Sequence, residues 1–177
     1  MRMNAEFADM SAVTRFCAAV RQVRDFVLLE GLPHQHWESE LLATEMRAKA
    51  FVKLSGFPFY RDTLSMSSED RQRLSHVLCD PETYSPFGGE KACGGFHPDY
   101  AVEWCPDGMV WRALICYGCG EIKLAGPATE LRCDIPPSVF VQLYGILADY
   151  HKNRPGHEAR KQGLAQVIAA ISRSAPE

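Results

Sequence analysis

Long apolar runs, a strong excess of one charge and internal repeats are all missing from this 177-residue sequence. No stretch reaches the roughly 18 consecutive apolar residues of a membrane-spanning helix, so no membrane contact is expected. The segment from Met1 to Phe16 carries Glu6 and Asp9 and has no continuous apolar core, which does not fit a signal peptide. Without export, the protein is expected in the reducing cytoplasm.

The charge balance excludes one broad class of function. The net charge is −3, and 23% of the residues are charged. Proteins that bind nucleic acid usually present a basic surface to the phosphates, and this composition offers none. Hydrophobic residues make up 46%, which is ordinary globular usage. Length and composition together predict a single domain over residues 1–177.

The cysteines lack the pattern of a disulfide framework. There are seven, which is an odd number, and their spacing is irregular. Disulfides are also rare in a reducing compartment. The cysteines are therefore predicted to be core residues, metal ligands or reactive thiols.

Helices are predicted in the first half of the chain and at both of its ends. Apolar residues recur every three or four positions over residues 5–29, and Gly31 and Pro33 end that pattern. Further helices are expected over residues 37–48 and 67–78, from Pro137 towards Asn153, and over residues 157–172. Residues 50–60 have the composition of extended chain, and the glycine-rich residues 80–96 predict a long loop.

Strands are predicted in the middle of the chain, over residues 100–104, 110–117 and 121–125. A turn at Pro106–Gly108 would place Trp104 opposite Val110 and Tyr100 opposite Leu114. We therefore predict an α+β fold in which a three- to four-stranded antiparallel meander is covered by the N-terminal and C-terminal helices.

The most specific chemical pattern is Cys116-Tyr-Gly-Cys119-Gly120, which has the outline of a zinc knuckle. The glycine permits the positive φ that so tight a turn needs. A redox Cys-x-x-Cys usually opens a helix, whose dipole lowers the thiol pKa. Because strands flank this motif, metal binding is favoured over redox chemistry.

A closed zinc site needs four ligands, and Cys93 and His97 are the best further candidates. The predicted register places His97 opposite Tyr117, inside the knuckle, and two glycines after Cys93 would let the chain fold back. The sequence thus predicts a Zn²⁺ site formed by Cys93, His97, Cys116 and Cys119.

Two other interpretations of the cysteines stay open. In the same register Cys116 shares a face with Val102 and Trp104, where a free cysteine packs as a small apolar side chain. Thiol chemistry is the third interpretation.

Two weaker patterns have simpler explanations. His34-Gln-His36 could bind a metal, but a polar start to the following helix explains it equally well. Asp99 and Glu103 could act with His97 as an acid–base set, but their strand positions predict solvated charges.

The cysteine and histidine residues also carry a resemblance to a group of uncharacterised bacterial proteins. These have a cysteine, then a stretch with proline and histidine, then a strand reading Ile-Cys-Phe-x-Cys. The matching segments here are Cys93-Gly-Gly-Phe-His97-Pro-Asp-Tyr100 and Leu114-Ile-Cys116-Tyr-Gly-Cys119, within about residues 50–126. The spacing from the first cysteine to the histidine differs. The resemblance implies a related fold and no activity.

The sequence shows no recognisable catalytic set of nucleophile, general base and oxyanion-hole donors. We therefore expect a non-enzymatic, intracellular bacterial protein-binding module of the immunity or accessory type, with a protein partner and a structural zinc ion. The alternative is a small zinc-dependent hydrolase or a thiol enzyme centred on the same four residues. The sequence does not indicate an oligomeric state.

Overall fold

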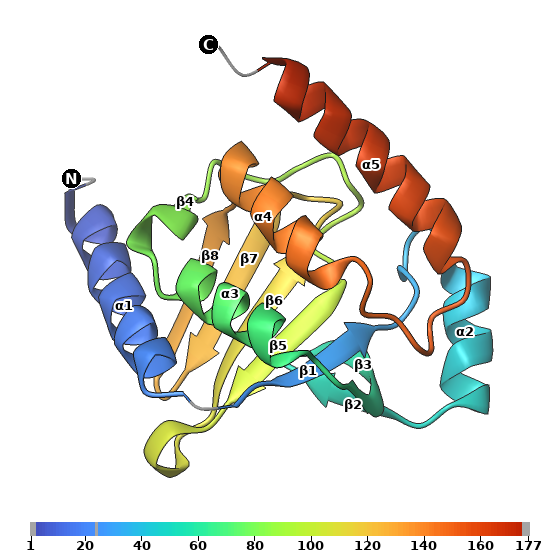
Figure 1. The fold of residues 1–177 in the computed structure, drawn as a ribbon, viewed down its shortest axis with the longest axis horizontal. Helices are drawn as coiled ribbons and strands as arrows, with labels where there is room; N and C mark the ends of the chain where they lie inside the picture. Colours follow the sequence, from blue (N-terminus) through green and yellow to red (C-terminus); the bar gives the residue numbers. More distant parts are fainter. Residues whose placement is uncertain (1–2, 24, 175–177) are drawn as a thin grey trace.

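The computed structural model describes residues 3–23 and 25–174. Within them, helices lie at both ends of the chain and a β-sheet is built from segments between them (Figure 1). The helices are α1 (Met3–Arg21), α2 (Ser39–Ala48), α3 (Ser68–Leu78), α4 (Pro137–Leu147) and α5 (His157–Ser174), with short 3₁₀ turns at Pro81–Thr83 and Pro106–Gly108. The strands are β1 (Val27–Gly31), β2 (Phe51–Leu54), β3 (Phe57–Leu64), β4 (Ser85–Pro86), β5 (Tyr100–Trp104), β6 (Trp111–Cys116), β7 (Glu121–Gly126) and β8 (Thr129–Asp134).

The sheet is larger than the sequence predicted. In the described residues, eight strands form one curled antiparallel sheet in the order β2-β3-β1-β5-β6-β7-β8-β4 (Figure 1). The predicted meander of three to four strands is therefore wrong, although its three strands form the centre as β5, β6 and β7. The prediction missed the strands that join this centre from distant parts of the chain, and periodicity within one segment carries no information about such pairing.

The first predicted helix is too long. α1 ends at Arg21, and residues 27–31 form β1 between β3 and β5. Leu28 is fully buried and lies opposite both Leu64 and Val102. An apolar run such as Val27-Leu28-Leu29 fits a buried strand as well as a helix. Here it forms a strand, because β3 and β5 pair with it on its two sides.

Other local predictions are confirmed. Ser67 caps α3 by accepting the Asp70 main-chain N–H, which satisfies a donor that the first turn leaves free. Residues 50–60 are extended, as predicted, and form the β2–β3 hairpin. Its turn uses positive φ angles at Ser55 and Gly56.

The two faces of the sheet are covered differently. Helices α1, α3 and α4 cover one face (Figure 1), with Phe16, Leu74 and Leu143 in the main core. The prediction that the N-terminal and C-terminal helices form this cover is therefore wrong, because the internal helices α3 and α4 lie beside α1 and α5 lies away from the sheet. The other face carries a smaller apolar cluster that includes Leu29, Phe59 and the segment around residues 93–96. No helix in the described chain has the length and apolar character needed to cross a membrane.

The register of the central hairpin differs by one residue from the prediction. Trp104 lies opposite Trp111, and Tyr100 lies opposite Ile115. The connecting turn is longer than expected because Asp107 and Gly108 both adopt positive φ. A shift of one residue exchanges the two faces. Cys116 therefore lies in the smaller cluster, away from the main core in which it was expected.

Candidate site around the cysteine cluster

The turn between β6 and β7 has the hydrogen bond of a knuckle. Cys116 ends β6, and its sulfur accepts the main-chain N–H of Cys119 at 3.3 Å. The main-chain N–H of His97 also donates to this sulfur. Gly120 has φ +64°, which is the conformation that the motif predicted for the residue after the second cysteine. Two N–H groups aimed at one sulfur are what a knuckle supplies to a ligating thiolate.

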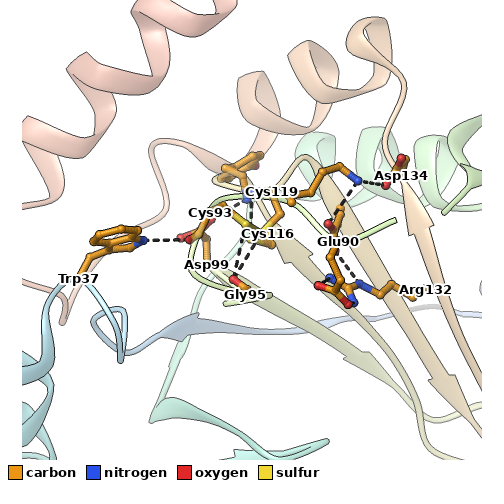
Figure 2. Close-up of a disulfide and its surroundings, with 12 residues drawn as sticks. Trp37, Glu90, Cys93, Gly95, Asp99, Cys116, Cys119, Arg132 and Asp134 are labelled. Atoms are coloured by element: carbon orange, nitrogen blue, oxygen red, sulfur yellow. Dashed lines mark hydrogen bonds and ion pairs between the residues drawn. A yellow bond between two sulfur atoms is a disulfide. The ribbon is translucent and has the colours of Figure 1, made fainter. Parts of the chain in front are cut away.

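Cys93 joins the turn through a disulfide bond with Cys119, across a Cα–Cα distance of 5.9 Å (Figure 2). The chain folds back at Gly94 and Gly95, which both have positive φ. The expectation that the cysteines form no disulfide is therefore not met at this pair. Three of the four predicted ligands, Cys93, Cys116 and Cys119, do lie together, in the smaller apolar cluster.

His97 meets the cluster through its main chain, while its ring points elsewhere. The ring Nε2 lies 2.7 Å from the carbonyl oxygen of Leu32, and the ring packs against His34 with centroids 4.6 Å apart. Because a carbonyl can only accept, Nε2 carries the hydrogen and Nδ1 is unprotonated. Burial lowers the pKa of His97 to about 4, so its ring is neutral at pH 7. Its role as the fourth zinc ligand stays a prediction.

The environment of Cys116 determines its reactivity. The side chain is buried, and desolvation raises the pKa of its thiol to about 12. The two N–H donors offset only part of this burial effect. A nucleophilic cysteine needs a substantial thiolate fraction near neutral pH. Cys116 is therefore a poor nucleophile.

Residues 87–98, here called the strap, lie over the smaller cluster and are anchored at neighbouring points in their first half. At Cys93 the anchor is the disulfide bond. Just before it, Lys91 pairs with Asp134 at 2.7 Å and Glu90 pairs with Arg132 at 2.9 Å (Figure 2). The Arg132 guanidinium also binds the fully buried Glu121 at 2.7 Å. This buried carboxylate thus positions the arginine that holds the strap.

A buried charge network lies beside the knuckle and was not predicted. Asp99 is 5% exposed and contacts the guanidinium groups of Arg154 and Arg160. Arg154, itself buried, donates to Glu38 at 2.5 Å. The expectation that Asp99 is solvated is wrong, because α5 and the preceding loop cover it. No local pattern signals these arginines, which lie more than 50 residues from Asp99 in the chain.

The His34-Gln-His36 segment leads through a turn into α2, which begins at Ser39 and fits the simpler interpretation of a polar start to the following helix. Nδ1 of His34 accepts the main-chain N–H of His36 at 3.0 Å and that of Trp37 at 3.3 Å. This use of Nδ1 leaves no lone pair on the His34 ring for a metal while Nε2 is protonated.

Trp37 is the surface residue that sequence reasoning overlooked. Its side chain is 66% exposed, yet its indole N–H donates to the carbonyl oxygen of Cys93 at 2.9 Å (Figure 2). The ring lies edge-on to His36 and directly over Gly94, where a Cβ would come within 2.8 Å of the indole nitrogen. A lone tryptophan gives no sequence signal of this placement.

Comparisons of the chain with protein-family models, with curated proteins and with solved structures gave no match.

Proposed function

We propose that this protein is a non-enzymatic protein-binding module and that Trp37, fixed on the strap, is the central contact of its binding surface. One observation carries the proposal: a tryptophan with two thirds of its surface exposed is held in one orientation. Tryptophan is among the residues most enriched at the energetic centres of protein interfaces.

The contacts of the indole support a binding surface that is preorganised before the partner binds. The hydrogen bond to Cys93 and the packing over Gly94 fix the ring before a partner arrives. A fixed side chain loses less conformational entropy on binding than a mobile one. Gly94 also allows close approach, because any side chain there would displace the indole.

In this proposal the cysteine cluster has a structural role. It anchors the strap end whose carbonyl group orients Trp37. Cys93, Cys116 and Cys119, with His97, would hold a structural zinc ion when the thiols are reduced. The disulfide and the zinc site exclude each other, because Cys93 and Cys119 cannot be bonded together and both bind zinc as thiolates. The partner we propose is an intracellular bacterial protein, bound by this chain in the cytoplasm as an immunity or accessory factor.

Two observations weigh against the alternative of a zinc hydrolase or thiol enzyme. Burial raises the pKa of the Cys116 thiol to about 12. Two open hollows of about 590 and 460 Å³ lie beside α3 and beside the 106–108 turn. Cys79 and Cys105 line them, but no residue of the cysteine cluster does. A substrate in these hollows would not reach the sulfur atoms of Cys93, Cys116 or Cys119.

The proposal is tested by a photocrosslinking amino acid placed at the exposed Gln35, two residues from Trp37, in the full chain and in cells of the native host. The matched control places it at Met109, which is 47% exposed at the far turn of the sheet. We expect one protein to be captured from position 35 and not from position 109. Its affinity for the purified chain should then fall by at least about tenfold in Trp37→Ala, with the free energy of unfolding unchanged within about 0.5 kcal/mol. Equal capture at both positions, or equal affinity for the variant, would overturn the proposal.

A further inference from the structure

Three side chains able to bind a metal meet where the α4–α5 connection enters α5. They are His151 in the connection and His157 and Glu158 in the first turn of α5. Their ligand atoms all lie within 4.8 Å of one another, and the two imidazole rings stack with centroids 3.8 Å apart. Among the described residues, this is the one group of three or more such side chains that comes so close.

His157 is prepared to act as a ligand. Its Nε2 lies 2.9 Å from the carbonyl oxygen of Ala148. A carbonyl only accepts, so Nε2 carries the hydrogen and Nδ1 presents its lone pair. Histidines that bind metals usually donate their other ring N–H to a main-chain carbonyl or a carboxylate, which fixes the ring and its tautomer. The contact with Ala148 is of this kind.

The main chain after His151 is also fixed. The buried carboxylate of Glu30 accepts the main-chain N–H of Lys152 at 3.2 Å and that of Asn153 at 2.8 Å. Contacts outside the cluster thus hold the main chain beside His151 and the ring of His157. The exposed side chains of His151 and Glu158 remain free to turn towards an ion.

From this geometry we propose that His151, His157 and Glu158 form a binding site for a divalent ion of the zinc type. Two imidazoles and one carboxylate are a ligand set that zinc uses, whereas calcium and magnesium prefer oxygen ligands alone. Bonds of about 2.0–2.1 Å to a tetrahedral ion place ligand atoms roughly 3.4 Å apart, so the side chains close inward by less than about 1.5 Å. Water fills the position that three protein ligands leave open.

The proposed site has a structural consequence for α5. This helix runs along the outside of the molecule, away from the sheet (Figure 1). Ion pairs from Arg160 to Asp99 and from Lys161 to Asp149 hold its first turns. A metal ion shared by His151 and His157 would add a bond between the helix start and the preceding connection.

The test titrates the full chain with zinc chloride by calorimetry, and with cobalt chloride by visible absorption. Thiolate-to-cobalt charge-transfer bands report the cysteine cluster, while a site of nitrogen and oxygen ligands gives d–d bands without them. The variants are His151→Ala and Glu158→Gln, and the matched control is His36→Ala, an exposed histidine outside the site. His151 is also exposed, so the fold should tolerate its loss, and circular dichroism checks this.

We expect one zinc equivalent that His151→Ala weakens by at least about tenfold and that His36→Ala leaves unchanged. The charge-transfer bands should be the same in all four proteins, which separates this site from the cysteine cluster. Equal zinc affinity in His151→Ala and the unchanged chain, or an absence of zinc binding outside the cysteines, would overturn the proposal.

Discussion

The carboxylate of Asp99 accepts the main-chain N–H of Tyr117 at 2.7 Å and so joins the buried charge network to the turn between Cys116 and Cys119. One oxygen of this carboxylate faces the turn, and the other faces Arg154 and Arg160. The cysteine cluster and the start of α5 are therefore coupled through one side chain.

Removing this carboxylate should destabilise the fold strongly. Asp99→Ala leaves the buried Arg154 without one of its two acidic partners, and losing one side of a buried ion pair costs about 3–5 kcal/mol. Asp99→Asn should cost less, because an amide oxygen can still accept the Tyr117 N–H. Urea denaturation measures both. If both variants lose the same free energy of unfolding, the contact between Asp99 and Tyr117 contributes nothing to stability.

The control for this comparison is Asp62→Ala. Asp62 pairs with Lys152 at the surface, where both side chains are more than half exposed. Exposed pairs contribute at most about 1 kcal/mol.

The strap offers a second prediction. Under non-reducing conditions, Cys93→Ser and Cys119→Ser should each lower the free energy of unfolding by about 3 kcal/mol, because each removes a crosslink that spans 26 residues. The double variant should lose no more than either single variant, since both lack the same bond. Limited proteolysis should then cut within residues 87–98. Cys105→Ser, at an exposed free cysteine, is the matched control.

If the protease still fails to cut the strap in Cys93→Ser, the ion pairs of Lys91 and Arg132 hold it without the disulfide.

The zinc prediction is tested separately, in protein purified under reducing conditions. To exclude the proposed histidine site, elemental analysis uses the His151→Ala chain, in which we expect about one zinc ion held by the cysteines. Adding Cys116→Ser or Cys119→Ser should remove this ion together with part of the stability. The Cys105→Ser control should keep the metal. A metal-free chain whose Cys116→Ser variant is stable would leave these cysteines a packing role alone.

Sequence reasoning succeeded where the signal is local. The Ser67 cap, the positive φ of the glycine after Cys119 and the polar segment at His34 before α2 are each decided within a few residues, and each is present. The proximity of Cys93, Cys116 and Cys119 was also predicted, from the hairpin register and from the two glycines after Cys93 that let the chain fold back.

The failures came from contacts between distant segments. Val27 to Leu29 could not be identified as a strand without knowing that β3 and β5 flank it. Asp99 could not be identified as buried without Arg154 and Arg160, which reach it from the other end of the chain. The register error had a smaller cause, since the left-handed conformations of Asp107 and Gly108 lengthened one turn.

Acid should weaken the fold through His97. Burial depresses the pKa of His97 to about 4 in the folded protein, below its ordinary value of 6.5. Between these values the unfolded chain binds the proton and the folded chain does not, so stability falls as the pH falls from about 6.5 to about 4 and levels off below. From pH 7 to pH 5 the loss from this residue is about 2 kcal/mol.

Urea denaturation at several pH values measures this slope. His97→Gln should reduce it, because an amide can donate to Leu32 but takes up no proton. His36→Gln, at an exposed ring, should leave it unchanged. An unaltered slope in His97→Gln would show that other groups control the acid sensitivity.

A single methyl group tests the assignment of residues 27–31 to a strand. Gly31 donates its main-chain N–H to the carbonyl oxygen of Asp99, and a Cβ on Gly31 would lie 2.1 Å from the carbonyl oxygen of Pro98. The obstacle is main chain, which cannot turn aside as a side chain can. Gly31→Ala should therefore destabilise the protein by about 1–3 kcal/mol through overpacking. If these residues instead belonged to the end of the first helix, the Pro98 carbonyl would not lie against position 31 and this overpacking would be absent.

Gly163→Ala is the matched control, because Gly163 lies within α5 and a Cβ there meets nothing within 4 Å. Alanine at that position should stabilise the protein by about 0.5–1 kcal/mol, since it removes the entropy that glycine loses in a helix. Urea denaturation should therefore show a lower free energy of unfolding for Gly31→Ala and a higher one for Gly163→Ala. This difference follows from β1 lying against residues 98–99. A neutral or stabilising effect of Gly31→Ala would contradict that contact, and with it the position of β1 next to β5.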